Sequence, residues 1–457
     1  MARHPIPLSS PPAIASRRNT TYASLAVLAA VYFWFWVVTA HRIDDLPQSG
    51  FARLFTTGCG DFEHFYFAAR AMREGSNLYS SGVHGYIYPP LIAFLFMPLT
   101  FVSVKTAALI MLIVNLALCV CCTWLAAAEM ARRLAVEATF NNIVLVAAVA
   151  TLLAATKLRS ELQMWQTNLL LLTAVLLALR FLDARPRLTG LLLGLAVNIK
   201  YLPLVYLPYL LLRRRFAAAA WFVAGIAGFA LLPALYSGWD ANLHHWAAAS
   251  SGVARMLGFG TLATQSANVD PITVGHSISI TSGIARIMGQ AAAPWAAWPV
   301  TGAVALAAAL ALRSIYMANG QALVAWPVAR DQAAAPYLGV VALEWAALMC
   351  LALAFSPQTN PRHTSLLLMV FVPLAVMLCF PRPGVSRWPA LAGTAILFFG
   401  LVLPPNTPQF TQQLMWWRNV GGAGWSMLLM LPFLFIAGFN HLNAATEVRR
   451  SGAAFRA

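Results

Sequence analysis

The chain has 457 residues, of which 60% are hydrophobic and only 10% are charged, and its formal net charge is +16. This composition excludes a soluble globular protein, since several apolar runs approach the roughly 20 residues that a helix needs to cross a bilayer. The runs are continuous rather than alternating, which argues against a β-barrel. The basic residues form short clusters between the runs, as in positively charged inner loops, so the charge does not indicate nucleic-acid binding. The composition predicts an all-α polytopic membrane protein.

The first predicted span, at about 22–40, follows a polar, Pro-rich N-terminus. It is long for the core of a signal peptide and no A-x-A site follows it, so we expect a retained anchor that runs from inside to outside. Residues 41–87 are then an external loop. The next apolar stretch, 88–103, is short and interrupted by three prolines, which predicts a re-entrant or interfacial element.

The middle of the chain continues with spans that the Lys and Arg clusters orient. They are predicted at about 105–130, 141–157, 166–182 and 216–236. The run 188–212 has two interpretations, because Lys200 stands at the centre of about 25 apolar residues. One long span would bury the ammonium at a cost of roughly 3 kcal/mol. Two short spans with Lys200 at the external apex fit better, because they place both flanking arginine clusters on the inner side.

The last part of the chain begins with a second external loop, about 237–294, in which we expect short surface helices. Further spans follow at about 295–313, 337–355, 363–380, 388–404 and 423–440. The total is about 12 spans in one transmembrane domain, 22–440, with cytoplasmic tails at 1–21 and 441–457. Every cysteine except Cys59 falls inside a predicted span, where it acts as a small hydrophobe, so no structural disulfide is expected.

Polar groups gather where this topology places the external ends of different spans. They are Asp61, Glu63, His64, Tyr86, Tyr88, Lys157, Arg159, Glu161, Gln166, Asn168, Asn198, Lys200, Gln265, Asn268, Arg362 and His363. Dispersed surface polarity would not need to lie at helix ends, and ionisable groups in membrane proteins usually serve function. The pattern predicts a cavity open to the outer leaflet, with Glu63, His64, Tyr88 and Gln265 among the residues that bind substrate.

Asp61 is the best single candidate for a catalytic residue, because a carboxylate is ionised at neutral pH and can accept a proton. An equally good interpretation is an N-cap of the helix predicted over 62–74, since Asp is a favoured cap. Glu63 is the rival base, but two residues along a helix it points elsewhere. No metal is expected. The two carboxylates Asp61 and Glu63 lack further ligands, and the adjacent side chains of His244 and His245 point apart on a helix.

Three basic residues in the polar set suit a phosphate. Lys200 at a helix junction can hold one as a point charge, or it can instead snorkel to the interface. His363, preceded by Arg362 and a Pro-rich turn, can donate to an anionic oxygen or carry a proton; the alternative is an interfacial anchor. Gln166 and Asn168 begin a span and can reach sugar hydroxyls, although helix capping accounts for Asn168 almost as well.

Five motifs follow one another between about residues 55 and 370. They are Asp61–Ala69 with Gly75–Tyr79, Tyr88–Leu91 and Met97–Leu99; Trp165–Leu169; Gly194–Lys200 with Pro203; Thr264–Ser266; and Ser356–Pro357 ahead of His363. In this order they resemble the polyprenol-phosphate-mannose-dependent α-mannosyltransferases, which are integral membrane enzymes of the GT-C fold. The family more often has Gly before Gln166 and Asn before Gln265, and these departures leave the sugar specificity open.

The resemblance implies a polyprenyl-phosphate donor that carries mannose or a similar hexose, and a glycolipid or polysaccharide acceptor. The partners are thus membrane lipids and no nucleic acid, in an inner (plasma) membrane with the site facing outward. Asp61 would match the acidic residue that the family uses in catalysis, and as a general base it would take the proton of the acceptor hydroxyl. The polyprenyl phosphate would leave with inversion at the sugar, and Lys200, His363 and Arg362 would stabilise its charge. No cofactor or divalent metal is required.

Functions of other classes explain less of the sequence. A transporter or flippase of a lipid-linked sugar would place ionisable groups near the bilayer midplane and often repeats its halves. Here the acids stand in an external loop and the halves do not match. A non-catalytic partner in envelope assembly predicts that Asp61 is dispensable, and an O-antigen ligase or polymerase gives no reason for this first loop. The sequence therefore favours a membrane glycosyltransferase.

Overall fold

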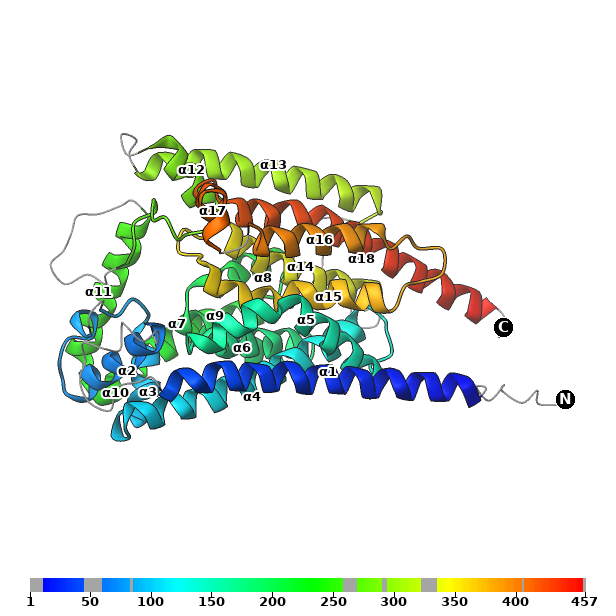
Figure 1. Cartoon of the computed structure of the whole chain (residues 1–457). Helices are drawn as coiled ribbons and strands as arrows, with labels where there is room; N and C mark the ends of the chain where they lie inside the picture. The colour runs from blue at the N-terminus through cyan, green and yellow to red at the C-terminus, as the bar shows by residue number, and fades with distance from the viewer. Residues whose placement is uncertain are drawn as a thin grey trace.

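The computed structural model describes residues 11–44, 60–82, 85–257, 269–289, 294–321, 335–404 and 407–454. Within these ranges the chain is all helical, and its helices run side by side as an elongated bundle (Figure 1). Eight of the described helices are long and apolar enough to cross a membrane: Arg18–Ile43, Val104–Arg133, Phe140–Gln163, Phe216–Ser237, Ala297–Ala318, Tyr337–Phe355, Pro361–Cys379 and Gly422–Glu447. The prediction of a polytopic α-helical membrane protein is confirmed.

The long helices contain α1 (Pro11–Asp44), α4 (Val104–Arg133), α5 (Phe140–Gln163), α9 (Phe216–Leu231), α13 (Ala297–Ala318), α14 (Ala335–Phe355), α15 (Leu368–Cys379) and α18 (Gly422–Ala454). The shorter apolar helices include α6 (Asn168–Phe181), α7 (Pro186–Ile199), α8 (Tyr206–Leu212) and α16 (Trp388–Val402). The helices α1 and α18 extend beyond the predicted spans 22–40 and 423–440. Because several predicted spans correspond to helices of only 10–17 residues, the total of about 12 stays a prediction. The five described cysteines are free, and Cys59 lies outside the described residues.

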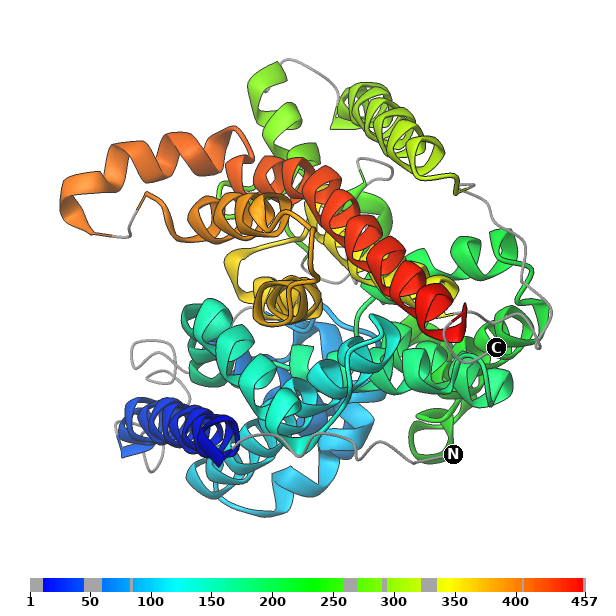
Figure 2. The ribbon, with the colours of Figure 1, turned by 90° about the vertical axis from the view of Figure 1, so that its right-hand side faces the viewer.

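The two ends of the bundle differ. The helix α1 begins and α18 ends at one end, which faces the viewer in Figure 2. At the other end lie α2 (Gly60–Arg73), α3 (Pro90–Phe96), α10 (Ala234–Ser237) and α11 (Trp239–Met256) (Figure 1). We call this the α2 end. The described part of the predicted second loop contains the helices α11 and α12 (Ile280–Met288), and α12 is buried from Ile280 to Ala285 rather than lying on the surface.

Residues 88–103 form a short, broken element, as predicted. The helix α3 has 7 residues and passes at once into the 3₁₀ helix η3 (Met97–Phe101) of 5 residues. Proline accounts for both starts, because it stands in the first turn of each helix, where its missing N–H costs nothing. The element stays beside α2 at the α2 end instead of crossing the bundle (Figure 1).

The apolar run 188–212 folds as two arms. The helix α7 ends at Ile199, Lys200 is extended with φ −151° and ψ 147°, and the 3₁₀ helix η4 (Leu202–Val205) leads into α8. Asp183 before α7 forms an ion pair of 2.6 Å with Arg215 after α8, so both ends of the run lie together. Lys200 is therefore at the apex of the two arms, as the positions of the basic clusters predicted.

The helices α7 and α9 approach each other closely through glycine. A Cβ on Gly190 would lie 2.4 Å from the carbonyl oxygen of Ala218, and one on Gly194 would lie 2.6 Å from the carbonyl carbon of Gly225. Small residues allow such contact between backbones in membrane helices, and Ala218 belongs to a run of four alanines at 217–220. This packing fixes the direction of α7 and with it the position of Lys200 at its end.

Candidate active site

A buried polar network joins five segments at the α2 end. Its members are Asp61 of α2, Glu161 of α5, Gln166 and Asn168 at the start of α6, Lys200 after α7, and Arg362 and Ser365 of the 3₁₀ helix η7 (Pro361–Leu367). All of them except Arg362 are buried. Hydrogen bonds connect every member to the next, which is what buried polar groups require.

Asp61 lies in the first turn of α2, and helices distant in the sequence engage both of its oxygens. Gln166 donates a hydrogen bond from Nε2 to Oδ2, and Arg362 forms an ion pair from Nη1 to Oδ1. Helix capping therefore does not account for this residue. The Asp61 side chain is 7% exposed and that of Arg362 is 39% exposed, so the network reaches the surface of the protein at Arg362.

Lys200 is held inside the network, 4% exposed. Its Nζ donates to Oε1 of Gln166 at 2.8 Å and to Oδ1 of Asn168 at 2.7 Å, and lies 5.1 Å from the centre of the Tyr88 ring. The N–H groups of a buried ammonium need hydrogen-bond acceptors, which these two oxygens supply, and the aromatic face adds a third favourable contact. The snorkelling interpretation of Lys200 is therefore wrong.

Glu161 closes the far side of the network. Its carboxylate accepts hydrogen bonds from the backbone N–H of Asn168 at 2.9 Å, from Nδ2 of Asn168 at 2.7 Å and from Oγ of Ser365 at 2.9 Å. With Asp61, Lys200 and Arg362 it makes a set of two carboxylates and two cations, so the formal charges of the network cancel. Glu161 is a member of the predicted polar set, but the sequence indicates no role for it beyond the presence of an acid at the end of an apolar span.

Trp165 orients Gln166 by an uncommon backbone conformation. Its φ is +47°, in the left-handed region that favours glycine. This is the position at which the resembled family more often has Gly. The strain is offset because the indole is fully buried and donates from Nε1 to the Ala108 carbonyl at 2.9 Å.

Tyr88 forms the aromatic side of the site. Its ring lies 5.0 Å from that of Phe65 and 5.7 Å from that of Tyr86, centre to centre. Burial raises the pKa of the Tyr88 phenol, and the nearby Asp61 carboxylate raises it further. The hydroxyl therefore stays protonated at physiological pH and remains a hydrogen-bond donor.

The remaining predicted site residues that the structure describes are not members of the buried polar network. Glu63 is buried beside Gly82, and His64 donates from Nδ1 to the Gly85 carbonyl at 2.6 Å. His363 is buried in the same turn as Arg362, and its Nδ1 accepts from the backbone N–H of Asn360 at 3.4 Å in a capping box. Gln265 lies outside the described residues.

No metal-ligand set is formed in the described part of the chain, where His, Cys, Asp and Glu side chains do not gather in threes. In the adjacent pair of histidines, His244 donates from Nδ1 to the Asp240 carbonyl of its own helix at 2.7 Å. His245 is buried, with its ring 6.3 Å from that of Tyr79. His245 thus contributes to the packing of α11, whereas His244 is exposed.

Comparison with known proteins gives a family and two relatives. The profile of glycosyltransferase family 87 matches residues 86–357. The polyprenol-phosphate-mannose-dependent alpha-(1-2)-phosphatidylinositol mannoside mannosyltransferase of Mycobacterium tuberculosis is 31% identical over 212 residues, which are 40% of this chain and 48% of the relative. The protein of the same name from Mycolicibacterium smegmatis is 30% identical over 212 residues, 41% and 46% of the two chains. The chain thus spans about half the length of the curated relatives it matches. The family match begins after Asp61 and ends before Arg362.

Proposed function

This chain belongs to glycosyltransferase family 87, and on that basis we propose that it transfers a hexose, with mannose the first candidate, from a polyprenyl-phosphate donor to a glycolipid. The names of both relatives support this donor, and they support an acceptor of the phosphatidylinositol mannoside type. The reaction takes place at the outer face of the membrane. The positive-inside pattern supports this orientation, because it puts the apex at Lys200 outside.

Asp61 is the general base of this proposed reaction. It removes the proton from an acceptor hydroxyl while the hydroxyl oxygen attacks the anomeric carbon of the donor sugar. The new carbon–oxygen bond forms as the bond to the phosphate oxygen breaks, and the polyprenyl phosphate leaves from the opposite face with inversion. A phosphate leaving group needs no general acid, so one carboxylate suffices, in contrast to the carboxylate pairs of glycoside hydrolases.

Arg362 is the cation that binds the donor phosphate in this proposal. It is the most exposed member of the network, and it pairs with Oδ1 of Asp61 while no substrate is bound. An anionic phosphate competes for the guanidinium, and a bidentate contact with phosphate is favourable. When Arg362 turns to the donor, Oδ1 becomes able to accept the hydroxyl proton. The donor thereby activates the base.

Lys200 and His363 complete the cationic side of the site. Lys200 holds Gln166 and Asn168 in place and adds a positive charge behind the base, which favours the leaving phosphate electrostatically. His363 is next to Arg362 on η7, within the same turn. A direct contact of either residue with the phosphate remains a prediction from the sequence.

The single observation that carries this proposal is the fixed orientation of Asp61 between a buried amide and an exposed arginine. The test is incubation of the purified protein with radiolabelled polyprenyl-phosphate mannose and a glycolipid acceptor, followed by analysis of the labelled lipid and of its anomeric configuration. We expect an α-linked product from a β-linked donor. Full turnover by the Asp61→Asn variant, or retention of the donor configuration, would contradict the mechanism.

A further inference from the structure

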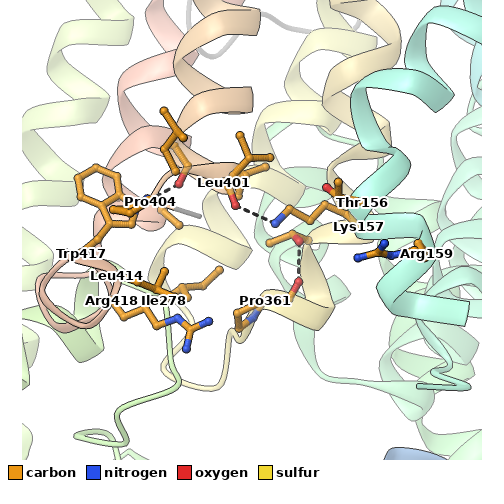
Figure 3. A pocket seen from close by; sticks show the side chains of 15 residues that line it. Thr156, Lys157, Arg159, Ile278, Pro361, Leu401, Pro404, Leu414, Trp417 and Arg418 are labelled. Atoms are coloured by element: carbon orange, nitrogen blue, oxygen red, sulfur yellow. Dashed lines mark hydrogen bonds between the residues drawn. The ribbon is translucent and has the colours of Figure 1, made fainter. Parts of the chain in front are cut away.

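A second polar site lies against the same turn of chain, η7. It is a cavity of about 360 Å³ between α5, α16, η7 and α17 (Thr411–Asn419) (Figure 3). Three cations line it: Lys157 and Arg159 of α5, and Arg418 of α17. The apolar part of the wall includes Leu401 and Trp417.

The charge in this cavity is unbalanced. None of its lining residues is acidic, and within the described ranges no carboxylate pairs with any of the three cations. Lys157 donates from Nζ to the Leu401 carbonyl at 2.8 Å (Figure 3). Arg159 lies over the ring of Trp34 on α1, 5.3 Å from its centre. The Nε of Arg159 is buried and has no hydrogen-bond partner among the described residues. Cations in a membrane protein that lack a protein counter-charge indicate an anionic ligand.

The helix η7 separates this cavity from Asp61. A 3₁₀ helix has three residues per turn, so residues three apart share a face. Pro361 and Thr364 line the cavity, whereas Arg362 and Ser365 contact the buried network. An anion bound in the cavity is therefore near the reaction centre but not in it.

The reaction chemistry distinguishes the two lipid substrates. The phosphate of the donor is bonded to the carbon that reacts, so it must lie beside Asp61. The phosphodiester of a phosphatidylinositol-type acceptor takes no part in the reaction and can be held elsewhere. The apolar wall beside the three cations suits the acyl chains of such a lipid.

We propose that the cavity of Lys157, Arg159 and Arg418 binds the phosphodiester of the acceptor glycolipid and thereby aims its sugar head at Asp61. The inference rests on the proposed function, because it assigns the acceptor of that reaction. It adds a site that separates acceptor recognition from donor recognition across η7.

The first test measures lipid binding, which does not depend on turnover. The variant Lys157→Gln/Arg159→Gln/Arg418→Gln is compared with a control that removes three other cations, Lys105→Gln/Arg187→Gln/Arg313→Gln. Affinities in detergent are measured for phosphatidylinositol, diacylglycerol, polyprenyl phosphate and inorganic phosphate. Since hydrogen bonds to charged groups are strong, we expect phosphatidylinositol to bind the first variant tenfold or more weakly than the wild type.

The same measurement separates the sources of a phosphate signal. We expect diacylglycerol and polyprenyl phosphate to bind the first variant as they bind the wild type, and the control to behave as the wild type with all four ligands. Equal affinity of phosphatidylinositol for the first variant and the wild type would overturn the inference. An equal loss of polyprenyl-phosphate affinity would also overturn it, because the cavity would then serve the donor. The inference would also be overturned if inorganic phosphate were the only one of the four ligands that binds the first variant tenfold more weakly than the wild type.

The second test measures transfer. We expect the variant to raise KM for the acceptor tenfold or more, with KM for the donor unchanged. Should the triple variant fail to fold, Arg418→Gln alone gives the test, because this side chain stands at the cavity edge on the short helix α17 and its loss raises the acceptor KM in the same direction. An unchanged acceptor KM would overturn the inference. Absence of transfer by the wild type, with cation-dependent phosphatidylinositol binding intact, would contradict the proposed function and leave the binding site standing.

Discussion

Lys200 and Gln166 form a hydrogen bond of 2.8 Å between Nζ and Oε1, and this contact decides which end of the Gln166 amide faces Asp61. An ammonium can only donate, so it must meet the amide oxygen. The amide nitrogen is then directed to the Asp61 carboxylate, to which it donates. One buried cation in the middle of an apolar run thus sets the orientation of the proposed base.

Replacement of Asp61 by Asn should reduce transfer by roughly 10²–10⁴-fold, which is the usual contribution of a general base. The variant keeps the shape of the side chain and an oxygen that can accept from Gln166, so it should still fold and bind donor. Initial rates with radiolabelled donor give the comparison. Glu63→Gln is the matched control, because Glu63 is a buried carboxylate of the same helix that lies beside Gly82. If the control lost activity and Asp61→Asn did not, the base would be Glu63.

Replacement of Arg362 by Gln should act on the donor. We expect KM for the polyprenyl-phosphate sugar to rise by roughly tenfold or more, since a charge-assisted contact with phosphate is removed. Arg362→Lys should restore part of the loss, because it keeps the charge without the bidentate geometry. Steady-state kinetics with varied donor and varied acceptor separate the effects. A rise confined to the acceptor KM would contradict the role of Arg362.

Replacement of Lys200 by Met should destabilise the protein. It leaves the Gln166 and Asn168 oxygens buried without a donor and the Glu161 and Asp61 charges less balanced. Removing one partner from such a buried network costs about 3–5 kcal/mol. The matched control is Lys105→Met in the first turn of α4, which we expect to change stability by about 0.5 kcal/mol or less. Thermal unfolding in detergent compares the two, and equal midpoints would show that Lys200 is not part of a structural network.

Replacement of Gly190 by Ala tests the contact of α7 with α9. The added Cβ would lie 2.4 Å from the Ala218 carbonyl oxygen, so one helix must shift, and overpacking of this kind costs about 1–3 kcal/mol. Gly228→Ala on α9 is the control, because its Cβ would meet nothing within 4 Å. Since Ala is the better helix former, this control should be neutral or slightly stabilising. A thermal midpoint that falls as far in the control as in Gly190→Ala would refute the close approach.

The apolar pattern predicted the helices well, because the demand for roughly 20 apolar residues per span is local to each segment. It also predicted the break at 88–103 from its prolines and the two arms of 188–212 from the position of one lysine. It was less informative about helix ends: α1 and α18 continue past the apolar core into polar residues, where helical hydrogen bonding persists without a hydrophobic signal.

The sequence by itself determined that this chain is a helical membrane protein. It also indicated Asp61, Gln166, Lys200 and Arg362 as candidate catalytic or substrate-binding residues. Only the tertiary structure decided their partners. Asp61 meets side chains that are 105 and 301 residues away in the chain, and Glu161 and the cavity of Lys157, Arg159 and Arg418 acquire their surroundings in the same way. Hydropathy depends on neighbours along the chain, whereas the pairing of buried charges depends on how α5, α7 and η7 pack together.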